Sequence, residues 1–149
     1  MTSNVNVAVI GSGYWGKNLI RNYSQIGALK VICDNNEILL DHFKNQYPAT
    51  EGCISINDIL SRDDVHGVVI ATPAEKHFSI AREALLAKKH VFVEKPLVLN
   101  ENEAVELITL AKQHKLTLMV GHLMQYHPLF QHLKSLVARG DLGRINYIY

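Results

Sequence analysis

Residues 5–16 of the chain read VNVAVIGSGYWG. The apolar run at their start is short and rich in β-branched residues, which favours a strand buried on both faces. It leads at once into Gly11-x-Gly13-x-x-Gly16, and the residues that follow have the spacing of an amphipathic helix. Strand, glycine-rich turn and helix in this order form the context in which G-x-G-x-x-G binds a dinucleotide.

Each glycine of this motif has its own predicted role. Gly11 allows the tight turn, Gly13 leaves room for a pyrophosphate against bare backbone, and Gly16 lets the helix pack closely on the strand. We expect the amides of Gly13, Tyr14 and Trp15 to point at an anion on the positive end of the helix. The loop therefore predicts a site for the phosphates of a nucleotide.

Strands and helices alternate along the rest of the chain. The predicted strands lie at 5–10, 29–33, 67–71, 90–93 and 116–120. The predicted helical stripes lie at 15–26, 38–47, 78–87 and 104–111, the last with Asn100 as its cap. Such alternation means right-handed βαβ units, so we expect an α/β fold with a Rossmann-like, doubly wound parallel sheet.

Asp34 follows the second predicted strand, 18 residues beyond Gly16. At that place a carboxylate can accept both ribose hydroxyls of an adenosine, and it repels a 2′-phosphate. The sequence therefore predicts NAD as the cofactor in preference to NADP. The alternative is a glycine-rich turn followed by an Asp that only caps a helix.

Two further polar groups follow predicted strands. Thr72-Pro73, with His77 a few residues on, follows the third predicted strand, and Glu94-Lys95-Pro96 follows the fourth. Ligands of doubly wound sheets bind beyond the carboxyl ends of the strands, so both loops should face the crevice of the glycine loop. Beside Pro96, which can take a cis peptide bond, Lys95 could donate to a substrate hydroxyl next to a nicotinamide. Taken alone, His77 would more often be a capping or packing residue, and Lys95 a solvated surface side chain.

Three segments resemble the Gfo/Idh/MocA oxidoreductases: TPAEKH at 72–77, AREALLA at 81–87 and HVFVEKPL at 90–97. The resemblance implies a nicotinamide cofactor, with the Thr72-Pro73 loop on its nicotinamide side and Lys95 near the reacting alcohol. The segments GYWGKN at 13–18 and GHLMQYHP at 121–128 are most similar to the nucleotide-sugar 3-dehydrogenases of that family, which oxidise a UDP-linked N-acetylated sugar or its uronate.

The resemblance implies the cofactor-binding half of an NAD-dependent sugar or nucleotide-sugar dehydrogenase. Lys95 and His122 are the candidate catalytic residues, and Tyr126 could line the sugar pocket beside His122. The candidate cofactor-binding residues are Gly11, Gly13, Tyr14, Trp15, Gly16, Asp34, Thr72, Pro73, His77, Glu94 and Lys95. The rival hypothesis is a truncated, non-catalytic dinucleotide-binding module. A methyltransferase is disfavoured, because S-adenosylmethionine has no pyrophosphate.

The resemblance also implies a domain division. Family members continue into a second α/β domain that supplies the substrate pocket and usually a catalytic His. We expect an NAD-binding domain over residues 1–121, and over 122–149 a connecting helix (128–139) and the first strand (144–149) of a substrate domain that is otherwise absent. We therefore expect the 149-residue chain alone to be inactive, and its apolar end at 145–149 to favour a homo-oligomer.

Two positions depart from the pattern of many relatives. Lys88 stands where many carry Gly, so Lys88 or Lys89 is expected to adopt a positive φ. Gln125 stands where many carry Arg, which removes a charged side chain that could contact an anion.

Composition excludes several classes of function. With 15 basic and 14 acidic side chains and a net charge of +1, the chain has no basic stripe for nucleic acid or a membrane surface. No apolar run reaches membrane-spanning length, and the absence of a cationic leader predicts a cytoplasmic protein. Cys33 and Cys53 are expected to be small buried hydrophobes. His122, His127 and His132 are spaced five apart, which on a helix turns their side chains roughly 140° apart, so no metal site is expected.

Overall fold

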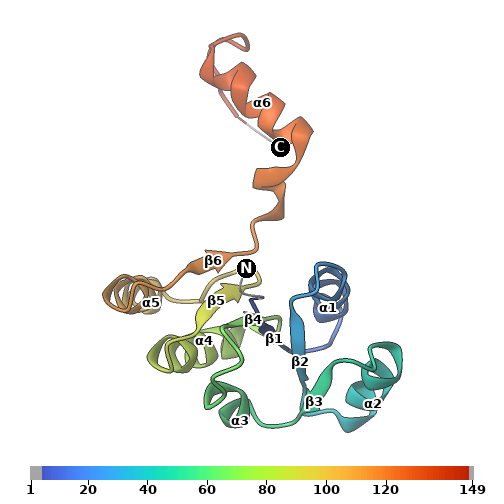
Figure 1. The fold of residues 1–149 in the computed structure, drawn as a ribbon. Helices are drawn as coiled ribbons and strands as arrows, with labels where there is room; N and C mark the ends of the chain where they lie inside the picture. The colour runs from blue at the N-terminus through green and yellow to red at the C-terminus, as the bar shows by residue number, and fades with distance from the viewer. Residues whose placement is uncertain (1–4, 148–149) are drawn as a thin grey trace.

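The computed structural model describes residues 5–147. Its centre is a six-stranded parallel sheet in the order β3-β2-β1-β4-β5-β6 (Figure 1). The strands are β1 (Val7–Ile10), β2 (Leu29–Cys33), β3 (Glu51–Cys53), β4 (Gly67–Ile70), β5 (His90–Val93) and β6 (Leu118–Val120). The order of the strands reverses between β1 and β4, so the predicted doubly wound, Rossmann-like fold is confirmed.

Helices cover both faces of the sheet (Figure 1). One face carries α1 (Gly16–Gln25) and α2 (Glu37–Gln46), and the other carries α3 (Ile56–Leu60), α4 (His77–Leu86) and α5 (Glu101–Gln113). Along β1 the side chains alternate between two cores: Val7 and Val9 pack with α1 and α2, whereas Ala8 and Ile10 pack with α4 and α5. This burial on both faces explains why the strands read as continuous apolar runs.

Several local predictions are confirmed. Asn100 caps α5, its side chain accepting a hydrogen bond from the N–H of Asn102. Lys88 has a φ of 62°, as expected where many relatives carry Gly, and the Lys95–Pro96 peptide bond is cis. Cys33 is buried, but Cys53 is only half-buried. The short elements β3 and α3 were not predicted, because so few residues do not reveal a period.

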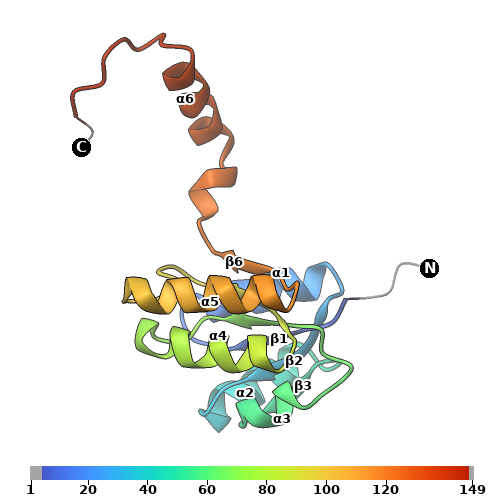
Figure 2. The same cartoon turned by 90° about the vertical axis from the view of Figure 1, so that its left-hand side faces the viewer.

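Beyond β6 the chain leaves the sheet. A single-turn helix, η2 (Leu123–Tyr126), leads to α6 (Pro128–Ala138), which stands apart from the other helices in Figures 1 and 2. The predicted helix over 128–139 is thereby confirmed, yet α6 contains no buried residue.

The predicted strand over 144–149 is not found. Residues 144–147 form no strand, and residues 148 and 149 lie outside the described part of the chain. The physical reason is that a strand needs a neighbour to pair with its N–H and C=O groups, and none of the described strands pairs with this segment. The alternating pattern at 144–147 was therefore insufficient to define a strand, and the division into two domains stays a prediction.

Candidate functional site

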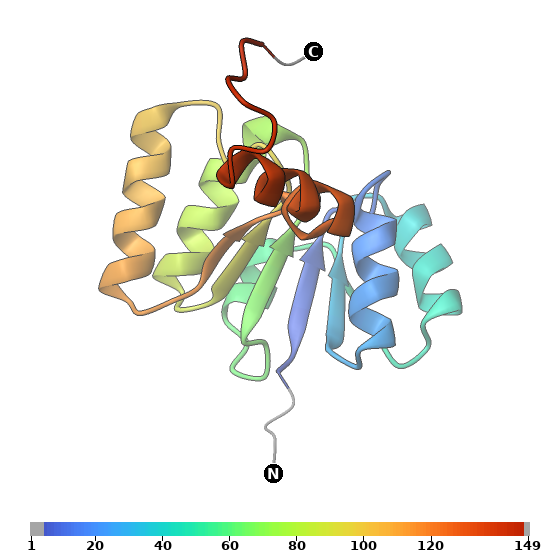
Figure 3. The same cartoon turned by 90° about the horizontal axis from the view of Figure 1, so that it is seen from above.

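The candidate site residues gather at one edge of the sheet. Because all six strands are parallel, their carboxyl ends lie together, as the arrowheads in Figure 3 show. The glycine loop follows β1 and Asp34 follows β2, near the point where the strand order reverses. Further along the sheet, Thr72 follows β4, Glu94 follows β5 and Gly121 follows β6. A ligand at this edge would meet all five loops.

The glycine loop is shaped by two close approaches and one open space. Gly11 has a φ of 90°, and a Cβ there would lie 2.8 Å from the carbonyl oxygen of Ala71. A Cβ at Gly16 would collide with the carbonyl group of Gly11, so only Gly lets α1 start so close to β1. A Cβ at Gly13 would meet no atom within 4 Å. The fold therefore requires Gly11 and Gly16, whereas Gly13 borders space that a ligand could fill.

The backbone of this loop can bind an anion. Within residues 5–147, no group accepts a hydrogen bond from the N–H of Gly13, Tyr14 or Trp15. These donors precede the first turn of α1, where the helix dipole favours negative charge. Free amides beside an open space fit the pyrophosphate of a dinucleotide.

Asp34 is tied to the glycine loop by short hydrogen bonds. Its Oδ2 accepts from the N–H of Ser12 at 2.7 Å and from the Ser12 hydroxyl at 2.6 Å, and its Oδ1 accepts from the N–H of Asn36 at 3.0 Å. Burial acts to raise the pKa of Asp34, but these hydrogen bonds outweigh it and hold the pKa below its ordinary value. The carboxylate is therefore ionised at neutral pH.

His77 connects the Thr72 loop to the Lys95-Pro96 loop. The residue is 1% exposed, and its ring lies with Nδ1 at 2.7 Å from the carbonyl oxygen of Pro96 and Nε2 at 2.9 Å from that of Thr72. Both ring nitrogens thus face groups of the protein itself. The hydroxyl of Thr72 is also buried but has no hydrogen-bond partner among the described residues. An orphaned buried hydroxyl in a loop of the site fits a contact that a ligand completes.

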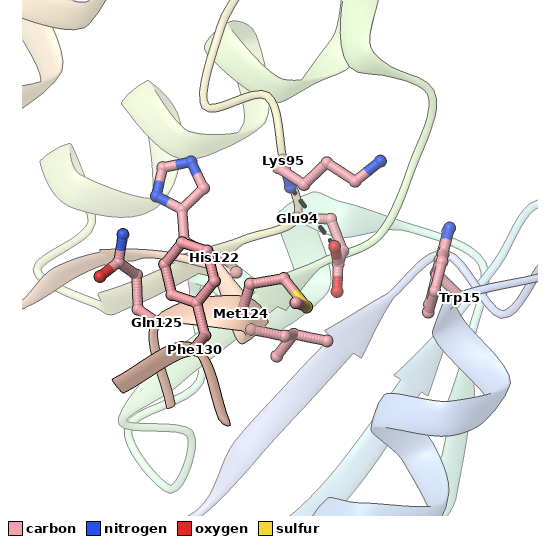
Figure 4. Close-up of a pocket in the computed structure, with 9 residues that line it drawn as sticks. Trp15, Glu94, Lys95, His122, Met124, Gln125 and Phe130 are labelled. Atoms are coloured by element: carbon pink, nitrogen blue, oxygen red, sulfur yellow. Dashed lines mark hydrogen bonds between the residues drawn. The ribbon is translucent and has the colours of Figure 1, made fainter. Parts of the chain in front are cut away.

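A pocket of about 510 Å³ joins the glycine loop to the end of β5. Figure 4 shows Trp15 on one side, His122 and Phe130 on the other, and Glu94 and Lys95 between them. Gly121, Leu123, Met124 and Gln125 complete the lining. The structure thus brings Lys95 and His122, the two candidate catalytic residues, to one cavity.

The two charged side chains of this pocket, Glu94 and Lys95, differ in exposure. Glu94 is 7% exposed, and among residues 5–147 its carboxylate accepts one hydrogen bond, at 3.4 Å from the N–H of Lys95. The side chain of Lys95 is exposed and forms no ion pair within the same residues. Both groups therefore have hydrogen-bonding capacity left for a ligand.

Several residues of the site were not among the predicted site residues: Ser12 and, in the pocket lining, Gly121, Leu123, Met124, Gln125 and Phe130. Ser12 occupies a variable position of the glycine motif, and nothing in the sequence links it to Asp34. Phe130 was assigned to an apolar helix face, since helical spacing does not reveal which apolar side chain lines a pocket.

Residues 5–147 contain neither a cluster suited to a metal ion nor a helix suited to a membrane. In residues 5–147, no three His, Cys, Asp or Glu side chains are grouped so that they could hold a metal ion. None of the helices in this part of the chain has the length and apolar character needed to cross a membrane.

A doubly wound parallel sheet with a glycine loop after its first strand and an acid after its second defines a dinucleotide-binding Rossmann domain. The family model described as "Oxidoreductase family, NAD-binding Rossmann fold" matches residues 5–122, and the chain belongs to this Gfo/Idh/MocA family.

Solved structures of similar proteins include three with known ligands or activities. UDP-N-acetylglucosamine 3-dehydrogenase from Acidithiobacillus ferrooxidans is 31% identical, with a TM-score of 0.80 over 87% of this chain and 42% of its own. Scyllo-inositol dehydrogenase from Lactobacillus casei, with NAD(H) and scyllo-inositol, is 25% identical, with a TM-score of 0.86 over 96% and 43%. A mutant of the 3-ketoreductase KijD10 from Actinomadura kijaniata, with TDP-benzene and NADP, is 25% identical, with a TM-score of 0.87 over 96% and 46%. The chain spans less than half the length of each of these proteins.

Proposed function

We propose that this chain is the cofactor-binding part of an NAD-dependent dehydrogenase that acts on a secondary alcohol of a sugar or nucleotide sugar. The observation that carries the proposal is the pocket shared by Trp15 of the glycine loop and by Glu94 and Lys95 after β5. A dinucleotide with its pyrophosphate on the glycine loop could extend one end towards Asp34 and the other into this pocket. Similarity to the UDP-N-acetylglucosamine and scyllo-inositol dehydrogenases supports the substrate class.

Asp34 supplies the preference for NAD. An ionised carboxylate accepts hydrogen bonds from ribose hydroxyls and repels a phosphate at the same place. Its three hydrogen bonds from Ser12 and Asn36 keep it charged and oriented. KijD10 was crystallised with NADP, so the family name alone does not predict this preference, and Asp34 is the residue on which it depends.

The residues around the pocket have separate roles in the proposed reaction. A nicotinamide bound here would supply the acceptor of a hydride from the alcohol carbon. Lys95 donates a hydrogen bond to the reacting hydroxyl, and His122 accepts its proton as the candidate base. The buried carboxylate of Glu94 accepts hydrogen bonds from the cofactor, and Thr72 contacts it through its orphaned hydroxyl. His77 acts through the two loops that it connects.

The single tryptophan of the chain provides the test, because Trp15 lines the pocket. NADH bound there should quench the indole and be excited by energy transfer from it, so titrations with NADH and NADPH give both affinities. We expect NADH to bind at least tenfold more tightly than NADPH. Asp34→Ala should weaken the binding of NADH and narrow the difference between the two affinities. Equal affinities, or tighter NADPH, would refute the role of Asp34.

The second candidate is the non-catalytic dinucleotide-binding module. It is favoured for these 149 residues alone by the exposure of His122 and Gln125, two of the residues that line the pocket. A sugar must be held on both sides for its carbon to stay near a nicotinamide. We expect the chain to bind NADH but, when supplied with NAD⁺ as the hydride acceptor, not to oxidise UDP-N-acetylglucosamine, its uronate, glucose or inositol. Turnover that Lys95→Ala abolishes would exclude the non-catalytic module.

A further inference from the structure

Ser12 is buried and hydrogen-bonded to Asp34, although it occupies a variable position of the glycine motif. The residue is 2% exposed, and both of its donors, the backbone N–H and the hydroxyl, reach the same oxygen of Asp34. Since an ionised carboxylate can only accept, the hydroxyl must be the donor in the 2.6 Å contact. One residue of the loop therefore holds one carboxylate oxygen with two bonds.

The acceptor capacity of Asp34 is largely used by these bonds. A carboxylate has about four acceptor positions, two on each oxygen. Ser12 occupies both positions on Oδ2, and the N–H of Asn36 occupies one on Oδ1. The backbone N–H of Asn35 is a further donor to this carboxylate. Little acceptor capacity therefore remains for the two ribose hydroxyls that Asp34 is predicted to bind, so the orientation of its oxygens matters.

We propose that Ser12 is a specificity-determining positioning residue, whose hydroxyl fixes Oδ2 of Asp34 on the glycine loop so that Oδ1 faces the adenosine ribose. The proposal deepens the proposed function, since it assumes that the loop binds NAD. Without the hydroxyl, Oδ2 keeps only the N–H of Ser12, and the terminal torsion of an Asp side chain has broad preferences. The carboxylate could then rotate away from the ribose or from a phosphate.

The charges around Asp34 are consistent with this role. Cys33, on the strand that precedes it, is the nearest titratable side chain on β2; burial and the neighbouring Cys53, Asp34 and Asp58 raise its pKa to about 12. It therefore stays a neutral thiol wherever the enzyme would work. Asp58 of α3 is the other acid that acts on this thiol. Hydrogen bonds, and not a neighbouring cation, keep Asp34 ionised.

The ratio of the dissociation constants for NADPH and NADH separates positioning from a merely structural role. If Ser12→Ala only distorted the glycine loop, both cofactors would bind more weakly by the same factor. If Ser12 positions the carboxylate, NADH should weaken roughly tenfold, the usual effect of losing a hydrogen bond to a charged group. NADPH should weaken less, because the repelling carboxylate can rotate away. Both constants come from one preparation, so an unfolded fraction cancels in the ratio.

The experiment compares Ser12→Ala, Ser12→Thr, Asp34→Ala and the control Ser79→Ala, whose wild-type hydroxyl donates to the carbonyl of Lys76 at an exposed site. We expect Ser12→Ala to move the ratio towards that of Asp34→Ala, and Ser12→Thr, which keeps a hydroxyl, to restore it. The acid limb of NADH binding should also move to higher pH in Ser12→Ala, because Asp34 loses a hydrogen bond that lowers its pKa.

The outcomes distinguish this inference from the proposed function. An unchanged ratio in Ser12→Ala, together with a collapsed ratio in Asp34→Ala, would overturn the role of Ser12 and leave the NAD site intact. A wild-type chain that binds neither cofactor would overturn the proposed function itself. Failure of Ser12→Thr to restore the ratio, in a variant that unfolds at the wild-type temperature, would also count against Ser12.

Discussion

The ring of His77 reaches the carbonyl oxygen of Pro96, 19 residues away, through Nδ1 at 2.7 Å. Its other nitrogen meets the carbonyl of Thr72, so one buried side chain spans the loops after β4 and β5. These loops carry Thr72 and Lys95, which the proposed function places around a nicotinamide. The position of Lys95 therefore depends on a residue that lies outside the pocket lining.

We expect His77→Ala to destabilise the fold by about 2–4 kcal/mol, because it removes a buried ring and its contacts with the carbonyl groups of Thr72 and Pro96. Urea unfolding followed by circular dichroism measures this change. The control is His132→Ala, whose side chain is exposed on α6 and should change the free energy of unfolding by less than about 0.5 kcal/mol. Equal effects of the two variants would show that His77 does not connect the loops.

Gly13 and Gly16 should respond differently to the same substitution. Gly13→Ala adds a Cβ to open space, so we expect the free energy of unfolding to change by less than about 1 kcal/mol. The added methyl group would lie where a pyrophosphate approaches the backbone, so NADH affinity should fall by roughly tenfold or more. Fluorescence titration and urea unfolding of the same sample test both parts, and undiminished NADH binding would contradict the predicted pyrophosphate site.

Gly16→Ala is the matched comparison. Its Cβ would collide with the carbonyl group of Gly11, so α1 and β1 must move apart. We expect a loss of at least about 1–3 kcal/mol in the free energy of unfolding, as for other overpacked sites. If Gly16→Ala unfolded at the same urea concentration as the wild type, the loop would relax around the added Cβ without a loss of stability. That result would contradict the close approach of Gly16 to Gly11.

The hydroxyl of Thr72 offers a test of binding without a loss of stability. Thr72→Val keeps the shape of the side chain and removes a buried hydroxyl that has no partner among residues 5–147. We therefore expect stability to be unchanged or slightly higher, but NADH affinity to fall severalfold. Thr109→Val, at an exposed hydroxyl that donates to Val105, is the control for binding. Unchanged NADH affinity in Thr72→Val would remove Thr72 from the proposed site.

Asp34 should make stability depend on pH. Its native pKa is lowered, since the hydrogen bonds from Ser12 and Asn36 outweigh burial. Its stabilising contribution is therefore complete above the ordinary carboxyl pKa, near pH 4, and is lost as the pH falls through the lowered native value. We expect Asp34→Asn to lower the free energy of unfolding more at pH 7 than at pH 3, with exposed Asp63→Asn as control. An equal loss at both pH values would contradict the ionised state of Asp34.

Much of the fold was predictable from local sequence signals. The run VAVI before Gly11-x-Gly13-x-x-Gly16 predicted β1, the turn and the start of α1, because strand burial and glycine geometry depend on a few adjacent residues. Asn100 was predicted as a cap for the same reason, whereas the positive φ at Lys88 or Lys89 was predicted from the resemblance, because many relatives carry Gly at position 88. The alternating pattern at 144–147 wrongly predicted a strand, because a strand forms only beside a partner strand, which the pattern itself does not contain.

The sequence by itself determined which residues follow each strand, and hence that the glycine loop, Asp34, Thr72, Glu94 and His122 belong to one edge of the sheet. Only the tertiary structure decided how they pair. The two bonds from Ser12 to Asp34, the bridge from Thr72 to Pro96 through His77, and the pocket shared by Trp15 and Lys95 join residues that are far apart in the chain. Such contacts depend on the order and spacing of strands in the sheet, which no local period of the sequence encodes.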